Sequence, residues 1–164
     1  MNAARETRWL DEKEGQVWAQ LSTMVLRLQP VLSAQLQREF GISQFEYVIL
    51  ARLSEAPESR LRMSVLATVT GSSLPRLSQA IGRLEKRGWV SRQPDEQNSR
   101  YTYAVLTPTG LGRLQEAAPS HVEAVREFVF VRLTRTQVRQ LGAICQRVLD
   151  GLPPDDSWPS ITAS

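Results

Sequence analysis

The residues of this chain whose types and spacing could do chemistry are long hydrogen-bond donors on one face of a predicted helix. Arg76, Gln79 and Arg83 stand three and four residues apart, so at 100° per residue their side chains share a face. Arginine binds phosphate and guanine, and glutamine pairs with adenine. A second face of this helix is apolar: Leu77, Ala80, Ile81 and Leu84. We therefore expect the helix to pack on a core and to present cationic donors to a grooved polyanion.

The first turn of this helix has the residues of a helix start. Ser72 and Ser73 are favoured before a helix, and Pro75 is tolerated in a first turn because its missing N–H would be unpaired there anyway. The helix is expected over about residues 73–87. We expect Ser72, Ser73 and Pro75 to lie close to the same phosphates or base edges that the three donors contact.

A small β-hairpin is predicted directly after the helix. Its strands are expected at 89–93 and 101–106, and the polar segment 94–99 forms its tip. Arg92, Asn98 and Arg100 are the candidate contacts of this wing, and the two arginines are expected near the tip, within reach of phosphates or a minor groove. The alternative, for these residues and for the helix, is a solvated basic surface.

The charge distribution favours the polyanion. Residues 60–113 hold nine basic and three acidic side chains, a net of +6, whereas the remaining residues hold eleven basic and fourteen acidic ones, a net of −3. Positive charge is thus concentrated on the segment that contains the helix and the hairpin. This segregation is the electrostatic footprint of a nucleic-acid-binding module.

Composition argues against several other classes of protein. One cysteine and one histidine cannot form an intramolecular disulfide or an ordinary zinc site, and no cofactor is expected. Cys145 lies in an apolar helical pattern and is predicted to be a buried structural thiol. No nucleophile–base set, catalytic carboxylate pair or phosphate-binding glycine loop predicts an enzyme. Without an apolar membrane span or secretory signal, the expected protein is soluble and cytoplasmic, with no membrane partner.

Helical periodicity places the remaining elements. A long amphipathic helix is expected over 11–40, kinked or broken at Pro30, and shorter helices over 44–53 and 64–69, with a loop at 56–59. Gly71 lies in the turn before the donor-bearing helix. Three short helices with such a turn between the last two predict a helix-turn-helix, and the hairpin makes it a winged one.

The terminal helices carry apolar stripes that this small unit cannot cover. Helices are expected from Pro108, with a kink near Pro119, and over 135–152. We expect a mainly α fold with a small β-hairpin wing, as one structural domain: a dimerisation region at 1–40, the winged helix-turn-helix at 41–106, dimerisation helices at 107–152 and a flexible tail at 153–164. Two chains would bury these stripes by intertwining their terminal helices. The dimer would then carry two DNA-reading helices, one for each half of a palindromic site. The alternative is a compact monomer.

Three side chains combine an apolar ring with a polar tip and could line a small-molecule cavity. They are Trp18, Tyr47 and His121. Plain core packing is the alternative for each of them.

Several segments, taken in order, resemble the MarR-type transcriptional regulators. They are QFEYVILARLSEAP at 44–57, LRMSVLA at 61–67, SQAIGRLEKRGWV at 78–90, YAVLTPTG at 103–110 and APSHVEAVR at 118–126. The wing departs from the family's Asp-Arg-Arg-like sequence: it reads DEQNSR at 95–100, so Arg100 takes the place of the wing arginine and one arginine is missing.

The resemblance implies a homodimer that binds palindromic double-stranded DNA, with the helix over 73–87 in the major groove and the wing in the minor groove. It also implies release by a small, often aromatic ligand bound between the dimerisation and DNA-binding regions. The expected function is that of a sequence-specific repressor. The alternative is a winged-helix protein-interaction module that does not read DNA.

Overall fold

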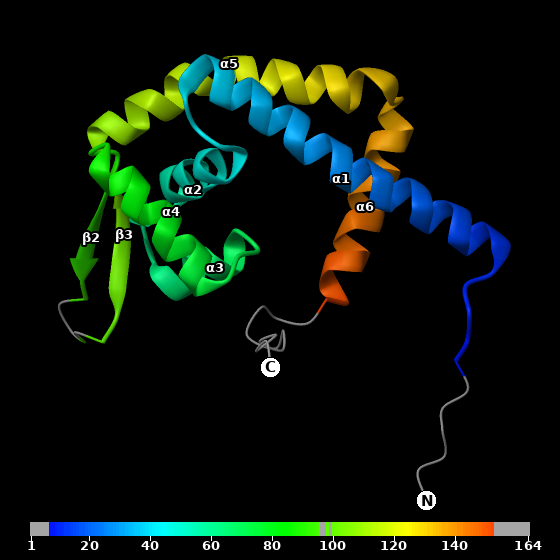
Figure 1. Ribbon diagram of the computed structural model, residues 1–164, viewed down its shortest axis with the longest axis horizontal. Helices are drawn as coiled ribbons and strands as arrows, with labels where there is room; N and C mark the ends of the chain where they lie inside the picture. The colour runs from blue at the N-terminus through cyan, green and yellow to red at the C-terminus, as the bar shows by residue number, and fades with distance from the viewer. Residues whose placement is uncertain (1–6, 96–97, 99, 153–164) are drawn as a thin grey trace, which may run out of the picture.

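The computed structural model describes residues 7–95, 98 and 100–152, and helices dominate these residues (Figure 1). The N-terminal elements are α1 (Glu12–Phe40), α2 (Gln44–Glu55), a 3₁₀ turn (Pro57–Ser59), β1 (Arg60–Arg62), α3 (Met63–Val69) and α4 (Leu74–Lys86). After them come β2 (Val90–Pro94), β3 (Thr102–Leu106), α5 (Pro108–Phe128), a second 3₁₀ turn (Phe130–Arg132) and α6 (Arg135–Asp150). The predicted tail at 153–164 lies outside the described residues.

Local capping signals set the ends of the first two helices. Asp11 and Glu14 form a capping box at the start of α1, and Ser43 and Glu46 form one at the start of α2. Between them Gly41, with φ 67°, ends α1 in the left-handed conformation that glycine adopts without strain. Pro30 lies inside α1 and does not break it, so the break considered at this position is wrong.

The sheet has three antiparallel strands in the order β1-β3-β2. The predicted hairpin is confirmed, with Val90 opposite Leu106 at its base. The sequence reading missed β1, which pairs with β3 through Leu61 and Ala104. A three-residue strand is too short to show alternation, so periodicity alone could not find it.

The core lies between α2, α3, α4 and the sheet. Its fully buried side chains include Ile49 and Leu50 of α2, Leu66 of α3 and the four apolar residues of α4. The predicted inner face of α4 is therefore confirmed. Because this face is held by the core, the donor-bearing face of α4 has a fixed direction.

The terminal helices form a separate layer. α1 and α5 lie side by side above the small helices, and α6 turns away from the end of α5 (Figure 1). No residue of α6 is buried, and large apolar side chains along α1, α5 and α6 stay exposed. The prediction of a buried Cys145 is wrong for this single chain, because its thiol lies on exposed α6.

Candidate nucleic-acid interface

The outer face of α4 presents most of the predicted contact residues. Ser73, Pro75, Arg76, Gln79 and Arg83 are all exposed. They come from successive turns of one helix, and their side chains therefore form a strip of the width that a groove can accept.

Ser72 does not belong to this strip. It is buried, its hydroxyl donates to the carbonyl of Ser73, and its amide donates to the carbonyl of Ala67. The expectation that Ser72 contacts DNA is therefore corrected: its polar groups fasten the turn that precedes α4. Ser73 stands at the cap position of α4 without a capping side-chain bond.

Both arginines of the strip rest on the first turn of α2. The guanidinium of Arg76 lies 4.7 Å from the centre of the Phe45 ring, a cation–π distance. The Nε of Arg83 donates to Oε1 of Glu46 over 2.8 Å. These contacts lean the two side chains toward α2, while the side chain of Gln79 makes no hydrogen bond within the described residues.

The carboxylate of Glu46 is buried, and its hydrogen bonds keep it ionised. Burial opposes its charge, but the hydrogen bonds from Ser43 and from Arg83, together with the charge of Arg83, outweigh that cost and hold the pKa of Glu46 below its usual value. A charged Glu46 therefore remains available to hold Arg83 at neutral pH.

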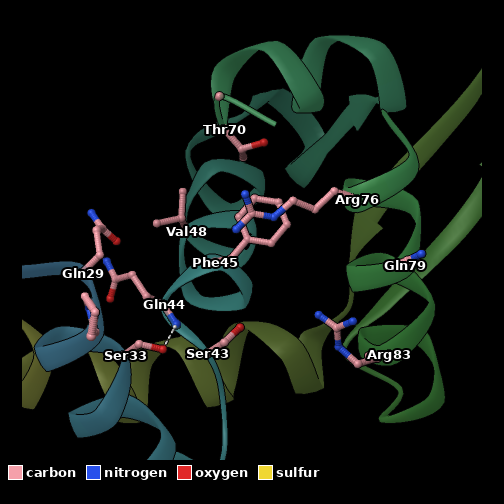
Figure 2. Close-up of a pocket in the computed structure, with 12 residues that line it drawn as sticks. Gln29, Ser33, Ser43, Gln44, Phe45, Val48, Thr70, Arg76, Gln79 and Arg83 are labelled. Carbon is pink, nitrogen blue, oxygen red and sulfur yellow. Dashed lines mark hydrogen bonds between the residues drawn. The ribbon is translucent and has the colours of Figure 1, made fainter. Parts of the chain in front are cut away.

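A hollow of about 760 Å³ lies beside the strip, between α1, α2 and α4 (Figure 2). Residues of α1, α2 and α4 line it together with the turn before α4: Gln29, Pro30, Ser33, Ser43, Gln44, Phe45, Val48, Thr70, Gly71, Arg76, Gln79 and Arg83. Gln44 is one of them, and its Oε1 atom is buried without a hydrogen-bond partner among residues 7–95, 98 and 100–152. Sequence reasoning missed this hollow because its polar residues come from three separate helices.

Arg92 does not extend to the tip of the wing. Its Nη2 donates to the carbonyl oxygen of Ser78 over 2.8 Å, and its Nη1 lies 3.2 Å from the carboxylate of Glu85. The predicted position of Arg92 near the tip is therefore wrong, since its side chain fastens β2 to α4. Arg100 and Asn98 stay exposed, and the side-chain oxygen of Asn98 accepts from the amide of Arg100.

The tip end of the wing is tied to β1. Nη2 of Arg62 donates to Oδ2 of buried Asp95 over 2.8 Å, and its Nε donates to the hydroxyl of Tyr103 over 3.1 Å. The same guanidinium lies 4.5 Å from the centre of the Tyr101 ring. From the sequence, Arg62 was only one of the basic residues of segment 60–113. Its role in holding the wing depends on β1, which was not predicted.

The three residues predicted to line one cavity are not brought together in the single chain. Tyr47 and His121 pack ring against ring, with centres 4.3 Å apart. Trp18 is 61% exposed and lines a different depression, which is formed by Leu10 and the first turns of α1. The prediction of a shared cavity is therefore wrong for the single chain.

Other chemistry is not visible in the part of the chain that the structure describes. Residues 7–95, 98 and 100–152 contain no cluster of three or more His, Cys, Asp or Glu that could hold a metal ion. None of the described helices is long and apolar enough to cross a membrane.

Comparison with known proteins identifies relatives that are transcriptional regulators, in agreement with the fold and with the exposed donors of α4. The model of the MarR family matches residues 40–100. Sco3205 of Streptomyces coelicolor, a MarR family transcriptional regulator crystallised in complex with DNA, is 41% identical, with coverage of 93% of this chain and 96% of that one and a TM-score of 0.88. AbsC of the same organism is 35% identical, with coverage of 88% and 97% and a TM-score of 0.82.

A curated relative agrees over a shorter length. The transcriptional repressor MprA of Escherichia coli K12 is 27% identical over 112 residues, which are 68% of this chain and 63% of that repressor. With fold, strip and relatives in agreement, the chain belongs to the MarR family of transcriptional regulators.

Proposed function

We propose that this protein is a cytoplasmic, homodimeric transcriptional repressor that binds a palindromic operator and catalyses no reaction. The observation that carries the proposal is the exposed donor strip of α4, fixed in direction by a fully buried opposite face. A helix of this kind enters the major groove, and the wing lies beside it over the backbone or the minor groove. The crystallised complex of Sco3205 with DNA supports this assignment.

The homodimer is supported by surface that one chain leaves uncovered. Exposed apolar side chains extend over the N-terminal half of α1 and over α5 and α6, including Val17, Trp18, Leu21, Met24, Val25, Phe128, Ile144, Val148 and Leu149. A monomer rarely leaves so many large apolar side chains in water. A twofold dimer would cover it and set two copies of α4 at successive turns of the major groove.

The decisive experiment compares the wild type with the double variant Arg76→Ala, Arg83→Ala. Binding to the DNA upstream of the protein's own gene is measured by electrophoretic mobility at several salt concentrations. The variant should lose specific binding and remain dimeric by sedimentation, and wild-type affinity should fall steeply as salt rises. Arg52→Ala, which removes an exposed ion pair with Glu55, is the control.

The alternative of a protein-interaction module makes the opposite prediction. Wild-type protein that shifts no genomic fragment specifically, and binds a protein partner with little dependence on salt, would establish that alternative. Normal specific binding by the double variant would instead show that α4 is not the reading helix.

The hollow beside the strip is the proposed effector site. Its wall includes Arg76, Gln79 and Arg83, so an occupant would compete with DNA for the same donors. An aromatic acid suits this hollow, because the Phe45 ring can stack on an aromatic ring and the arginines can donate hydrogen bonds to a carboxylate. A panel of aromatic acids should include one that releases operator DNA from the wild type, and Gln44→Leu should weaken that release without weakening DNA binding.

A further inference from the structure

Both carboxylate oxygens of Glu46 are occupied by groups that belong to different elements. Oε2 accepts the backbone amide of Ser43 over 3.0 Å and completes the capping box of α2, while Oε1 accepts Nε of Arg83 from α4. The side chain of Glu46 is only 5% exposed, so water does not compete for either bond. One buried carboxylate thereby joins the first turn of α2 to the reading helix.

The other end of Arg83 is left open. Its side chain is 53% exposed, and its Nη1 and Nη2 atoms have no hydrogen-bond partner among the described residues. The guanidinium is planar, so the hydrogen bond at Nε restricts its orientation and leaves the pair of Nη donors available for another partner. The Nη1 and Nη2 groups of an arginine can donate to two acceptors at once, such as O6 and N7 of guanine.

Arg76 provides an internal contrast. It rests on the Phe45 ring, an apolar support that attracts the cation without accepting a directed hydrogen bond. Its guanidinium can rotate over the ring, whereas that of Arg83 is held by a hydrogen bond at a set angle. The two arginines of the strip are therefore positioned differently.

We propose that Glu46 is a specificity-determining positioning residue, which orients the Nη edge of Arg83 toward one guanine in each half of the operator. The inference rests on the proposed function, because it concerns how the same strip reads DNA. Glu46 itself lies below the surface and does not touch the bases; it acts through Arg83. Arg76, in contrast, is free to follow a phosphate or either base of a pair.

Glu46→Gln separates this role from the folding role of Glu46. The glutamine oxygen can still accept the Ser43 amide, as Gln137 does for Thr134 in the capping box of α6. Its –NH₂ group cannot accept from Nε of Arg83. The variant should therefore fold with its cap intact and lose the bond that orients Arg83. Glu14→Gln, at the matching position of the α1 capping box, is the control.

The test measures binding of each variant to the operator and to a set of operators with one base pair changed. Glu46→Gln should reduce discrimination at one symmetric pair of positions by about tenfold, the effect of losing a bidentate contact of about 1–3 kcal/mol. Its discrimination elsewhere and the salt dependence of its binding should match those of Glu14→Gln. Arg83→Ala should lose discrimination at the same positions, and adding Glu46→Gln to it should change nothing further.

The outcomes separate this proposal from the proposed function. Full discrimination by Glu46→Gln, beside a loss in Arg83→Ala, overturns the role of Glu46 and leaves the repressor intact. Full discrimination by Arg83→Ala also overturns it, because Arg83 then reads no base. A wild type that discriminates among no DNA sequences removes the proposed function itself.

Discussion

The imidazole ring of His121 packs against the phenol ring of Tyr47, with ring centres 4.3 Å apart and planes inclined by 52°. This contact joins α5 to α2 and so links the terminal-helix layer to the helix-turn-helix. His121 is only 7% exposed, and its Nδ1 has no hydrogen-bond partner within the described part of the chain. Burial lowers the pKa of His121, and burial together with the charge of Glu55 raises the pKa of Tyr47, so both rings are neutral at neutral pH.

The lowered pKa of His121 predicts a pH dependence of stability. Between that lowered pKa and the ordinary value of 6.5, the unfolded chain binds a proton at His121 that the folded chain does not. The free energy of unfolding should therefore rise with pH across this window, by at most about 1.4 kcal/mol per pH unit for one proton. Urea unfolding at fixed protein concentration measures it. His121→Phe should remove this contribution, and an unchanged slope in that variant would contradict the prediction.

Gly110 is predicted to be intolerant of any side chain. A Cβ at this position of α5 would lie 2.1 Å from the carbonyl oxygen of Trp89, which itself accepts the amide of Thr107. Gly110→Ala should therefore lower the free energy of unfolding by about 1–3 kcal/mol, because backbone rather than a mobile side chain must shift. Gly112→Ala, in the same helix with open space around the new methyl group, should be neutral or stabilising by up to about 1 kcal/mol. Equal stabilities of the two variants in denaturant unfolding would refute this account.

The ion pair between Arg62 and Asp95 is predicted to fix the wing. Asp95→Asn keeps the shape of the side chain and weakens the charged contact, which should cost about 1 kcal/mol of stability because Arg62 is partly exposed. Operator affinity, measured by fluorescence anisotropy, should fall severalfold, and proteases should cleave the hairpin faster. Glu55→Gln, which breaks an exposed pair on α2, should change neither property. Wild-type cleavage and affinity in Asp95→Asn would show that the wing is held by other contacts.

The exposed stripe of α6 is predicted to lie in the dimer interface. Ile144 is 60% exposed in the single chain, and Ile144→Asp would place a charge in the interface that we propose. Sedimentation equilibrium should give a dimer for the wild type and a much weaker dimer, or a monomer, for this variant. Val69→Asp places the same charge on an exposed apolar position of α3 and should leave the dimer intact. Dissociation of both variants, or of neither, would refute the assignment of this face.

Local sequence signals determined the reading helix. The alternation of Leu77, Ala80, Ile81 and Leu84 with the donor positions is a property of one helix, and it predicted both the buried face and the exposed one. The two strands of the hairpin followed in the same way from the pattern of their residues and from the polar turn between them. The charge segregation and the ordered family segments then gave the class of protein.

Only the tertiary structure decided what each of these side chains contacts. In the sequence Glu46 is only one residue of a predicted helix, and its bond to Arg83 links residues 37 positions apart. Arg92 reads as a wing-tip contact, and its bonds to Ser78 hold it against α4. Periodicity fixes the direction of a side chain relative to its own helix or strand, whereas its partner depends on how distant elements pack. The sequence therefore specified the donor strip, and the packing of α2 and the wing against α4 determined how its arginines are held.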